Sequence, residues 1–324
     1  VTGNAPGNDM RYSEKKIIAS RNFANKVWNA SRFMLMNIEK ADLSNVSLAD
    51  LTPADKWILS KANSLVKEVT DNMEKYDFGV AVAKLNDFIW EEFCDWYIEM
   101  VKPRLYTTKA AALFTLKKVL TISLKLLHPY MPFITEEIFC SLQDEEESIM
   151  VSEWPVFEEE FDFKAEENEV EMIKNAVRNI RNLRADMNVP PSKKASVYVV
   201  SEKEEVRRVF EDSKVFFATL GYASEVHVQA DKAGIAEDAV STVIPDAVIY
   251  MPFAELVDVE KEIARLEKEA GRLEGEIKRA KGMLSNERFV SKAPAAKVEA
   301  EKEKLEKYTA MAAQVAERLS QLKK

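Results

Sequence analysis

Residues 256–284 read LVDVEKEIARLEKEAGRLEGEIKRAKGML, and apolar residues recur along them in alternating steps of three and four. This spacing is the a/d seam of a coiled-coil helix. It resumes from Val298 to Leu322, with Glu301 as its only break. Pro294 lies between the two runs, and proline can begin a helix but interrupts a continuing one. The sequence therefore predicts a C-terminal antiparallel two-helix coiled coil over residues 256–324, an arm roughly 45 Å long.

Cations gather where this predicted hairpin turns. They are Lys278, Arg279, Lys281, Arg288, Lys292 and Lys297, with the acid Glu287 and the aromatic Phe289 among them. Cations suit a phosphate backbone, and an aromatic ring suits a stacked base. Lysines that keep a turn soluble, and a phenylalanine that closes it, explain the same residues equally well. Both interpretations stay open on composition.

The net charge of −9 hides an uneven distribution of acids. Residues 144–171 hold thirteen Asp and Glu against Lys164 alone, which gives −12, so the rest of the chain sums to +3. An acidic average argues against a nucleic-acid partner. The local balance removes that objection, because binding depends on the field at the contact surface.

Composition argues against several classes of protein. No run of 18 uncharged apolar residues is present, so no membrane-spanning segment is expected. The start, VTGNAPG, does not resemble a signal peptide, and the missing initiator Met suggests a piece of a longer protein. Cys94 and Cys140 lack a CxxC partner, which predicts buried free thiols in a reducing cytosol. Neither His128 nor His227 is near a cysteine, so no zinc site is expected.

The apolar spacing predicts a helical bundle for residues 1–150. Five helices are expected, at about 13–38, 52–76, 78–101, 107–127 and 132–142. Thr52 and Pro53 form a start signal, because threonine caps a helix and proline fits its first position. Short connections between such helices are typical of an up-and-down bundle.

Residues 151–255 read as a linker helix followed by a small α/β domain. The acidic stretch is expected to be a linker into a helix over about 163–188, which VPPS at 189–192 ends. Strands are expected at 197–200 and 226–228 around a helix at 202–220, with a β-hairpin at 240–250. The predicted fold class is therefore mainly α, with a bundle, a small α/β domain and a coiled coil.

No arrangement of residues typical of catalysis is present. The eight glycines form no phosphate-binding loop, and no Ser/His/Asp pattern occurs. Carboxylate pairs such as Glu91 and Glu92 are interpreted as solvated acids on helix surfaces. We expect neither a catalytic residue nor a bound metal or cofactor in this chain.

The first predicted helix offers a candidate RNA-binding face. Its residues Asn22, Lys26, Asn29 and Phe33 follow the spacing i, i+4, i+7, i+11, which places them on one side. Two amides, an ammonium and a ring are the groups that bind single-stranded bases. Packing of Asn29 and Phe33 within the bundle is the alternative explanation. Further candidates for contacts with the RNA backbone are Lys15 and Arg21.

Two more basic clusters follow. Residues 101–127 contain cations and no acid: Lys102, Arg104, Lys109, Lys117, Lys118 and Lys125. Arg178, Arg181 and Arg184 are spaced by three, which predicts a stripe along one helical edge that could contact an RNA backbone. Neighbouring residues in this last cluster are Lys174, Lys193 and Lys194, opposed by Asp186.

Several stretches, taken in order, resemble the C-terminal half of bacterial valyl-tRNA synthetases, which are class I aminoacyl-tRNA synthetases. They are GNDMR (7–11), RNFANKVWNA (21–30), DWYIE (95–99), HPYMPFITEE (128–137), the segment from Arg181 to VPPSK (189–193), and NERFVSKAP (286–294). RNFANK, DWY and HPxMPFxTEE also occur in the isoleucine and leucine relatives. NERFVSKAP is more particular to the valine enzymes. The resemblance covers essentially the whole chain.

The resemblance implies an anticodon-binding bundle at 1–150, an α/β linker domain at 151–255, and an arm at 256–324 that touches the tRNA elbow. Its implied partner is valine-specific tRNA, with no DNA and no membrane, in the cytoplasm. The class I signatures HIGH and KMSKS are absent. The catalytic and editing domains are therefore expected to be missing, and the chain to be inactive alone. The parent enzyme, a valine–tRNA ligase, would use ATP with Mg in a catalytic domain that normally lies in cis.

Two alternatives remain. The first is the corresponding half of an isoleucyl- or leucyl-tRNA synthetase, which NERFVSKAP disfavours. The isoleucine relatives also typically end in a cysteine-rich zinc module that two cysteines cannot build. The second is a protein-binding coiled-coil scaffold, which predicts apolar residues on the outer face of the arm.

Overall fold

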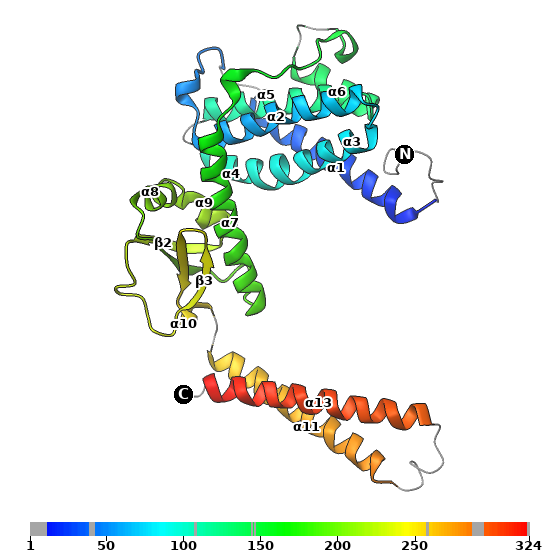
Figure 1. The fold of residues 1–324 in the computed structure, drawn as a ribbon, viewed down its shortest axis with the longest axis vertical. Coiled ribbons are helices and arrows are strands. Elements are labelled where there is room, and N and C mark those ends of the chain that lie inside the picture. The colour runs from blue at the N-terminus through cyan, green and yellow to red at the C-terminus, as the bar shows by residue number, and fades with distance from the viewer. Residues whose placement is uncertain are drawn as a thin grey trace.

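A computed structural model describes residues 12–38, 43–106, 109–143, 145, 147–256, 259–286 and 295–322. Figure 1 shows a helical bundle, a small α/β body and a two-helix arm, which follow one another along the long axis in chain order. The mainly α fold class is confirmed. The limits of the three domains stay a prediction.

The bundle contains the helices expected from the apolar spacing. They are α1 (Glu14–Ile38), α2 (Pro53–Glu74), α3 (Phe78–Asp87), the π-helical segment η2 (Phe88–Tyr97), α4 (Ile98–Val101), α5 (Lys109–Leu127) and α6 (Pro132–Leu142). The backbone N–H and the hydroxyl of Thr52 both donate to Asp55 Oδ2, at 2.9 and 2.8 Å, and so mark the start of α2. The helix expected at 78–101 is π-helical in its middle, a change that apolar spacing did not reveal.

Short 3₁₀ turns complete this half of the chain: η1 (Leu48–Asp50), η3 (Lys102–Tyr106), η4 (Ile149–Val151) and η5 (Glu159–Phe161). The acidic stretch that carries the last two is not a free linker. Its Glu158 exchanges two hydrogen bonds with the Asn63 side chain of α2, at 2.7 and 2.8 Å. Trp154 Nε1 donates to Thr70 Oγ1 at 2.9 Å. The stretch therefore packs along the bundle.

Helix α7 (Lys164–Asp186) leads from the bundle into a four-stranded sheet of order β2-β1-β4-β3. The strands are β1 (Ala195–Val200), β2 (Ala223–Gln229), β3 (Val240–Ile244) and β4 (Ala247–Met251), and only the β1–β2 pair is parallel. The helix expected between β1 and β2 is two helices, α8 (Glu204–Asp212) and α9 (Lys214–Leu220), because the chain turns at Ser213. The Thr242 hydroxyl of β3 donates to Asn179 Oδ1 of α7 at 3.2 Å.

The arm consists of α11 (Val259–Leu284) and α13 (Ala295–Leu322), which pack against each other. Leu266, Leu273 and Ala280 recur in steps of seven and are buried, as a coiled-coil seam requires. One expected seam residue, Leu256, instead ends a separate short helix, α10 (Phe253–Leu256). Within the described ranges, no helix combines the length and apolar character needed to cross a membrane.

Candidate nucleic-acid interface

The orientation of α1 decides which of its side chains can reach a ligand. Phe23, Val27, Ala30 and Met34 form its buried stripe. At about 100° per residue, Asn22 and Asn29 fall roughly 110–130° to one side of this stripe, and both are exposed. Lys26 and Phe33 lie between them and the stripe, and both are half-buried. The four candidates share one edge of the helix, but they are not equally open to solvent.

Lys26 is committed to contacts within the bundle. Its Nζ lies 2.6 Å from Asp95 Oδ1 and 3.8 Å from the centre of the Trp90 ring, which leaves 21% of the side chain exposed. Phe33 packs against the hydrophobic core, as the alternative explanation of the sequence proposed. Asn22 and Asn29 are therefore the more accessible members of the candidate set.

Trp28 lies on α1 but is not one of the binding residues predicted from the sequence. It is 47% exposed and lies on the outer side of α1 with Arg21, Asn25 and Arg32, which are also exposed. The signal was present in the sequence. Residues 21, 25, 28 and 32 follow the i, i+4, i+7, i+11 spacing directly opposite the apolar stripe. The predicted candidate Lys15 is exposed near the start of the helix.

The arginine stripe predicted on α7 is only partly open. Arg178 and Arg181 are exposed, with their guanidinium carbons 5.3 and 5.7 Å from the centre of the Trp96 ring. Arg184 is buried and donates hydrogen bonds to the carbonyls of Pro190 and Lys193. A step of three residues falls about 60° short of a full turn, so three such residues turn from solvent into the core. Arg184 is buried in this structure, which argues against a contact between its side chain and RNA.

Several cations of the other basic clusters form ion pairs within the protein. Lys174 is completely buried, with Nζ at 2.5 Å from Glu92 and 2.6 Å from Glu171. Arg104 is buried against Asp55, and Lys118 pairs with Glu158 at 3.1 Å. Within the cluster over residues 101–127, Arg104 is therefore closed to a ligand, whereas Lys102 and Lys109 are exposed.

The arm keeps its cations open to solvent. Lys278, Arg279 and Lys281 near the end of α11 are exposed, and so is Lys297 in the first turn of α13. The other predicted tip residues, Arg288, Phe289 and Lys292, lie outside the described residues. Charged side chains also occupy the outer positions of α11 and α13 away from the tip, a part of the arm called the shaft below. This argues against a protein-binding scaffold.

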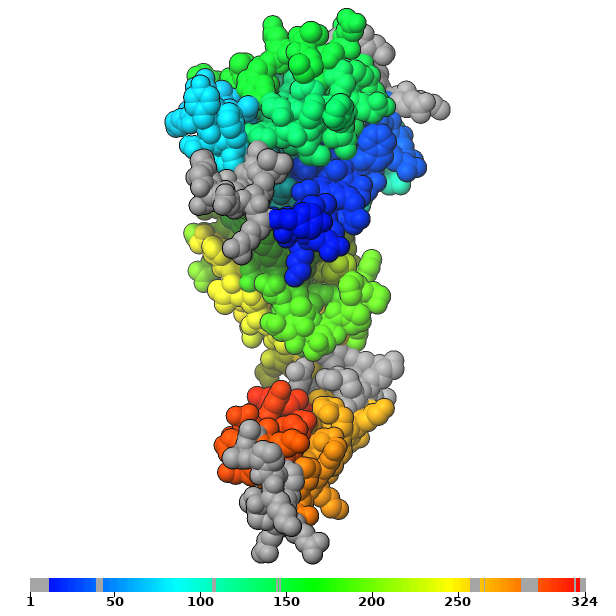
Figure 2. Space-filling view, turned by 90° about the vertical axis from the view of Figure 1, so that its right-hand side faces the viewer, coloured from blue at the N-terminus to red at the C-terminus, as the bar shows by residue number. Residues whose placement is uncertain are grey.

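Figures 1 and 2 show how the elements that carry the exposed candidates are arranged. In Figure 1, the N-terminal part of α1 and the far end of the two-helix arm both extend toward the right. Figure 2 views the molecule from that side, with α1 in blue on the visible face above the α/β body. An elongated ligand on this side could therefore contact both the bundle and the arm.

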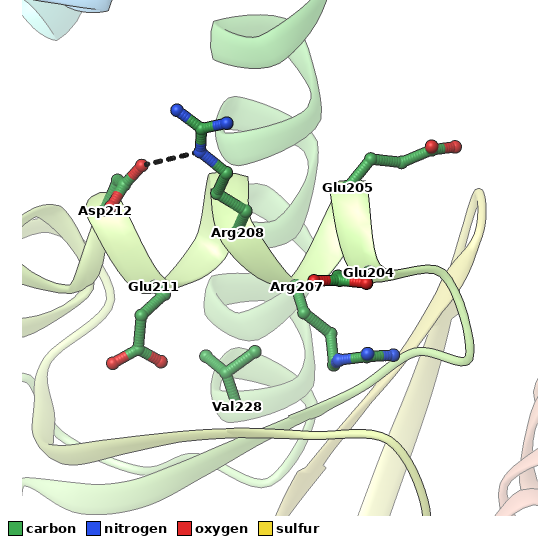
Figure 3. A pocket seen from close by; sticks show the side chains of 7 residues that line it. All are labelled: Glu204, Glu205, Arg207, Arg208, Glu211, Asp212 and Val228. Carbon is green, nitrogen blue, oxygen red and sulfur yellow. Dashed lines mark ion pairs between the residues drawn. The ribbon is translucent and has the colours of Figure 1, made fainter.

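A surface hollow beside α8 has a different character. Four carboxylates line it, from Glu204, Glu205, Glu211 and Asp212, together with Arg207, Arg208 and Val228 (Figure 3). Arg208 faces Asp212 at 3.8 Å, and Arg207 donates to the carbonyls of Ser201 and Glu202. Because four carboxylates line the hollow and both arginines already contact protein oxygens, the hollow does not suit a phosphate backbone.

The two cysteines differ in environment. Cys94 is buried, whereas Cys140 is exposed, so the prediction of two buried thiols is wrong for Cys140. Among the described side chains, no group of three or more His, Cys, Asp and Glu residues could hold a metal ion.

Comparisons with known proteins match two parts of the chain to tRNA-binding families. A family model described as the anticodon-binding domain of tRNA ligase matches residues 55–199, and one described as the valyl tRNA synthetase tRNA binding arm matches residues 258–323. The chain matches the C-terminal 37% of bacterial valyl-tRNA synthetases.

The chain is 50% identical to the valine–tRNA ligase of Clostridium acetobutylicum. The match covers all of this chain and 37% of the length of that relative. The valine–tRNA ligase of Clostridium perfringens is 48% identical over 99% of this chain and 37% of its own length. That of Carboxydothermus hydrogenoformans is 40% identical over 94% of this chain and 35% of its own. These names agree with the valine assignment and give no support to the isoleucine or leucine alternative.

Within this match to valyl-tRNA synthetases, the DWY motif at 95–97 joins separate helices. Asp95 pairs with Lys26 of α1, and Trp96 faces cations of α7. The Tyr97 hydroxyl donates to Asp55 of α2 at 2.6 Å. The motif therefore connects η2 to α1, α7 and α2.

Proposed function

We propose that this chain is the tRNA-recognition part of a valine–tRNA ligase. The edge of α1 that carries Asn22, Lys26 and Asn29 binds the anticodon region of valine-specific tRNA, and the cations at the arm tip bind the tRNA elbow. The parent enzyme attaches valine to this tRNA with ATP and Mg, in a catalytic domain that lies outside this chain. The observation that carries the proposal is the match along the whole chain to this part of valine–tRNA ligases.

The side chains of the α1 surface and of the arm tip suit different parts of the tRNA. The α1 surface offers amides and a partly exposed tryptophan, which suit unstacked bases. The tip offers exposed cations, which suit phosphates. Linking two weak sites on one rigid ligand makes the second contact intramolecular and raises the overall affinity.

The first experiment measures binding of the whole chain to valine tRNA and to isoleucine tRNA across a salt series. We expect tighter binding of valine tRNA, with log K falling linearly in log salt because phosphate contacts release counterions. Equal and weak binding of both tRNAs would contradict the proposal.

Two sets of variants then separate the sites. Asn22→Ala with Asn29→Ala should weaken binding of both the full tRNA and an isolated anticodon hairpin. Its control is Asn86→Ala, an exposed asparagine on α3. Reversal of Lys278, Arg279 and Lys281 to Glu should weaken only the full tRNA. Reversal of three exposed shaft lysines, Lys268, Lys302 and Lys307, is the matched control. If the tip reversal weakened binding of the full tRNA and of the anticodon hairpin equally, the assignment of separate tRNA regions to α1 and to the arm tip would be refuted.

A further inference from the structure

Helix α7 connects the bundle to the α/β body and contacts both. Near the middle of the helix, Lys174 pairs with Glu92 of η2 at 2.5 Å, which ties α7 to the bundle. Farther along, the Asn179 side chain accepts a hydrogen bond from the Thr242 hydroxyl of β3 at 3.2 Å. The two bodies therefore meet at the second half of α7.

Arg181 in this half of α7 contacts both bodies at once. Its Nε donates a hydrogen bond to the carbonyl of Leu220, the last residue of α9, at 2.7 Å. Its guanidinium carbon lies 5.7 Å from the centre of the Trp96 ring, which belongs to η2 and is buried. The last carbonyls of an α-helix have no partner within the helix, so the end of α9 can accept such a donor. One guanidinium therefore joins the bundle, α7 and the α/β body.

Arg178 lies over the same ring and provides a comparison. Its guanidinium carbon is 5.3 Å from the centre of the Trp96 ring, and its ion pair is with Glu171 of its own helix, at 4.0 Å. The hydrogen bond to α9 distinguishes Arg181 from Arg178 among the described contacts. A planar guanidinium can face a ring while one N–H points at a carbonyl, whereas a lysine ammonium is a point charge on a flexible chain.

The orientation of the α/β body affects the arm, which follows it in the chain (Figure 1). The backbone N–H of Ser196 donates to Glu255 at 2.6 Å, which ties α10 to β1 just before the arm begins. At 1.5 Å per residue, the 26 residues of α11 span about 39 Å, so a tilt of about 10° would move the far end by about 7 Å. A small change at the junction therefore changes the distance between α1 and the arm tip.

We propose that Arg181 is a positioning residue that sets the angle between the bundle and the α/β body, and that it does not contact the RNA backbone. Through this angle it matches the spacing of the two tRNA-binding ends to the tRNA. The inference rests on the proposed function and names the residue that couples its two sites. The second contact raises the affinity most when the span between two linked sites fits the ligand.

Distances between spin labels test the angle directly. The labels are placed on the native Cys140 of α6 and on Ser241→Cys of β3, both exposed, while the buried Cys94 stays unlabelled. We expect a shifted or broader distance distribution in Arg181→Met and Arg181→Lys than in the wild type. Arg208→Lys is the control, since this arginine pairs within its own helix, α8, and should leave the distribution unchanged.

Binding measurements test the consequence for tRNA. Arg181→Lys keeps the positive charge, so near wild-type binding by this variant would indicate a simple phosphate contact and overturn the inference. We instead expect full-length valine tRNA to bind about tenfold more weakly to both Arg181→Lys and Arg181→Met, with binding of the anticodon hairpin unchanged.

A double-mutant cycle separates positioning from contact. In a chain that carries the reversal of Lys278, Arg279 and Lys281 to Glu, the arm no longer contributes to binding. Arg181→Lys should therefore cost no further affinity in that chain. If Arg181 contacted the RNA itself, the two losses would add, and this result would also overturn the inference.

A merely structural role for Arg181 predicts lower stability of its variants, with unchanged label distances and unchanged tRNA binding in the folded protein. That result overturns the inference while the proposed function stands. If the tip reversal alone does not weaken binding of the full tRNA, the proposed function fails, and the label distances still decide whether Arg181 sets the angle.

Discussion

The guanidinium of Arg104 donates two parallel hydrogen bonds to the carboxylate of Asp55, at 2.8 and 2.7 Å, and both side chains are buried. The hydroxyl of Tyr97 donates a third, at 2.6 Å. Burial and the charge of Asp55 raise the pKa of Tyr97 well above its ordinary value, so the hydroxyl remains a donor. This cluster joins the start of α2 to the end of η2.

Arg104→Met should lower the free energy of unfolding by about 3–5 kcal/mol, because it leaves a buried carboxylate without its cation. Denaturant unfolding measures the change. Lys102→Met is the control, since its pair with Glu99 is half exposed and should contribute less than about 1 kcal/mol. If the two variants lost similar amounts of unfolding free energy, burial of the Arg104–Asp55 pair would not explain its contribution.

Lys174→Met should destabilise the contact between α7 and the bundle by about 3 kcal/mol, because Glu92 loses its buried partner. Intrinsic fluorescence reports the site directly, since the lysine ammonium lies 4.8 Å from the Trp57 ring and 5.6 Å from the Trp96 ring. The control is Lys164→Met, whose side chain is 61% exposed. An unchanged unfolding midpoint for Lys174→Met would contradict the prediction.

Alkaline pH should destabilise the protein through Cys94. Burial, partly opposed by Lys26, raises the pKa of this thiol from 9.0 to about 12. Between these values the unfolded chain has lost a proton that the folded chain keeps. The free energy of unfolding therefore falls with rising pH, by about 1.4 kcal/mol per unit for this group, and the group has no such effect below pH 9.

Cys94→Ala removes this contribution, so its stability should fall less steeply than that of the wild type between pH 9 and 11. Denaturant unfolding at a series of pH values measures the two slopes. Cys140→Ala, at the exposed cysteine, should retain the steep fall of the wild type. Parallel curves for Cys94→Ala and the wild type would refute the assignment to Cys94.

Leu273→Ala should weaken the arm without affecting the bundle. Leu273 is completely buried in the seam, and such a truncation costs about 2–5 kcal/mol. All five tryptophans precede residue 155, so fluorescence follows the bundle and its adjoining stretch, while circular dichroism also follows the arm. We expect earlier loss of helical signal with an unchanged fluorescence transition. Glu274→Ala, at an exposed position, should leave both transitions in place.

The fold was largely predictable because its signals are local. The alternating three- and four-residue steps predicted the arm, and Thr52-Pro53 predicted the start of α2. The π-helical middle of the stretch after α3 was not predictable in this way. A π-helix changes the hydrogen-bonding register within a sequence whose apolar pattern still reads as α-helical.

The candidate site was predictable only in part. Helical spacing placed Asn22, Lys26, Asn29 and Phe33 along one edge of α1, and charge placed the cations at the arm tip. Neither signal says whether a cation is already paired.

Sequence alone determined most of the helices, the strands and most of the coiled-coil seam, because each depends on residues a few positions apart. Tertiary structure alone decided which cations remain available. Lys26 meets Asp95 across 69 residues, and Lys174 meets Glu92 across 82. Arg184 turns inward because α7 packs on the α/β body there. Long-range pairing and burial remove a charge from the surface, and a local sequence pattern predicts neither of them.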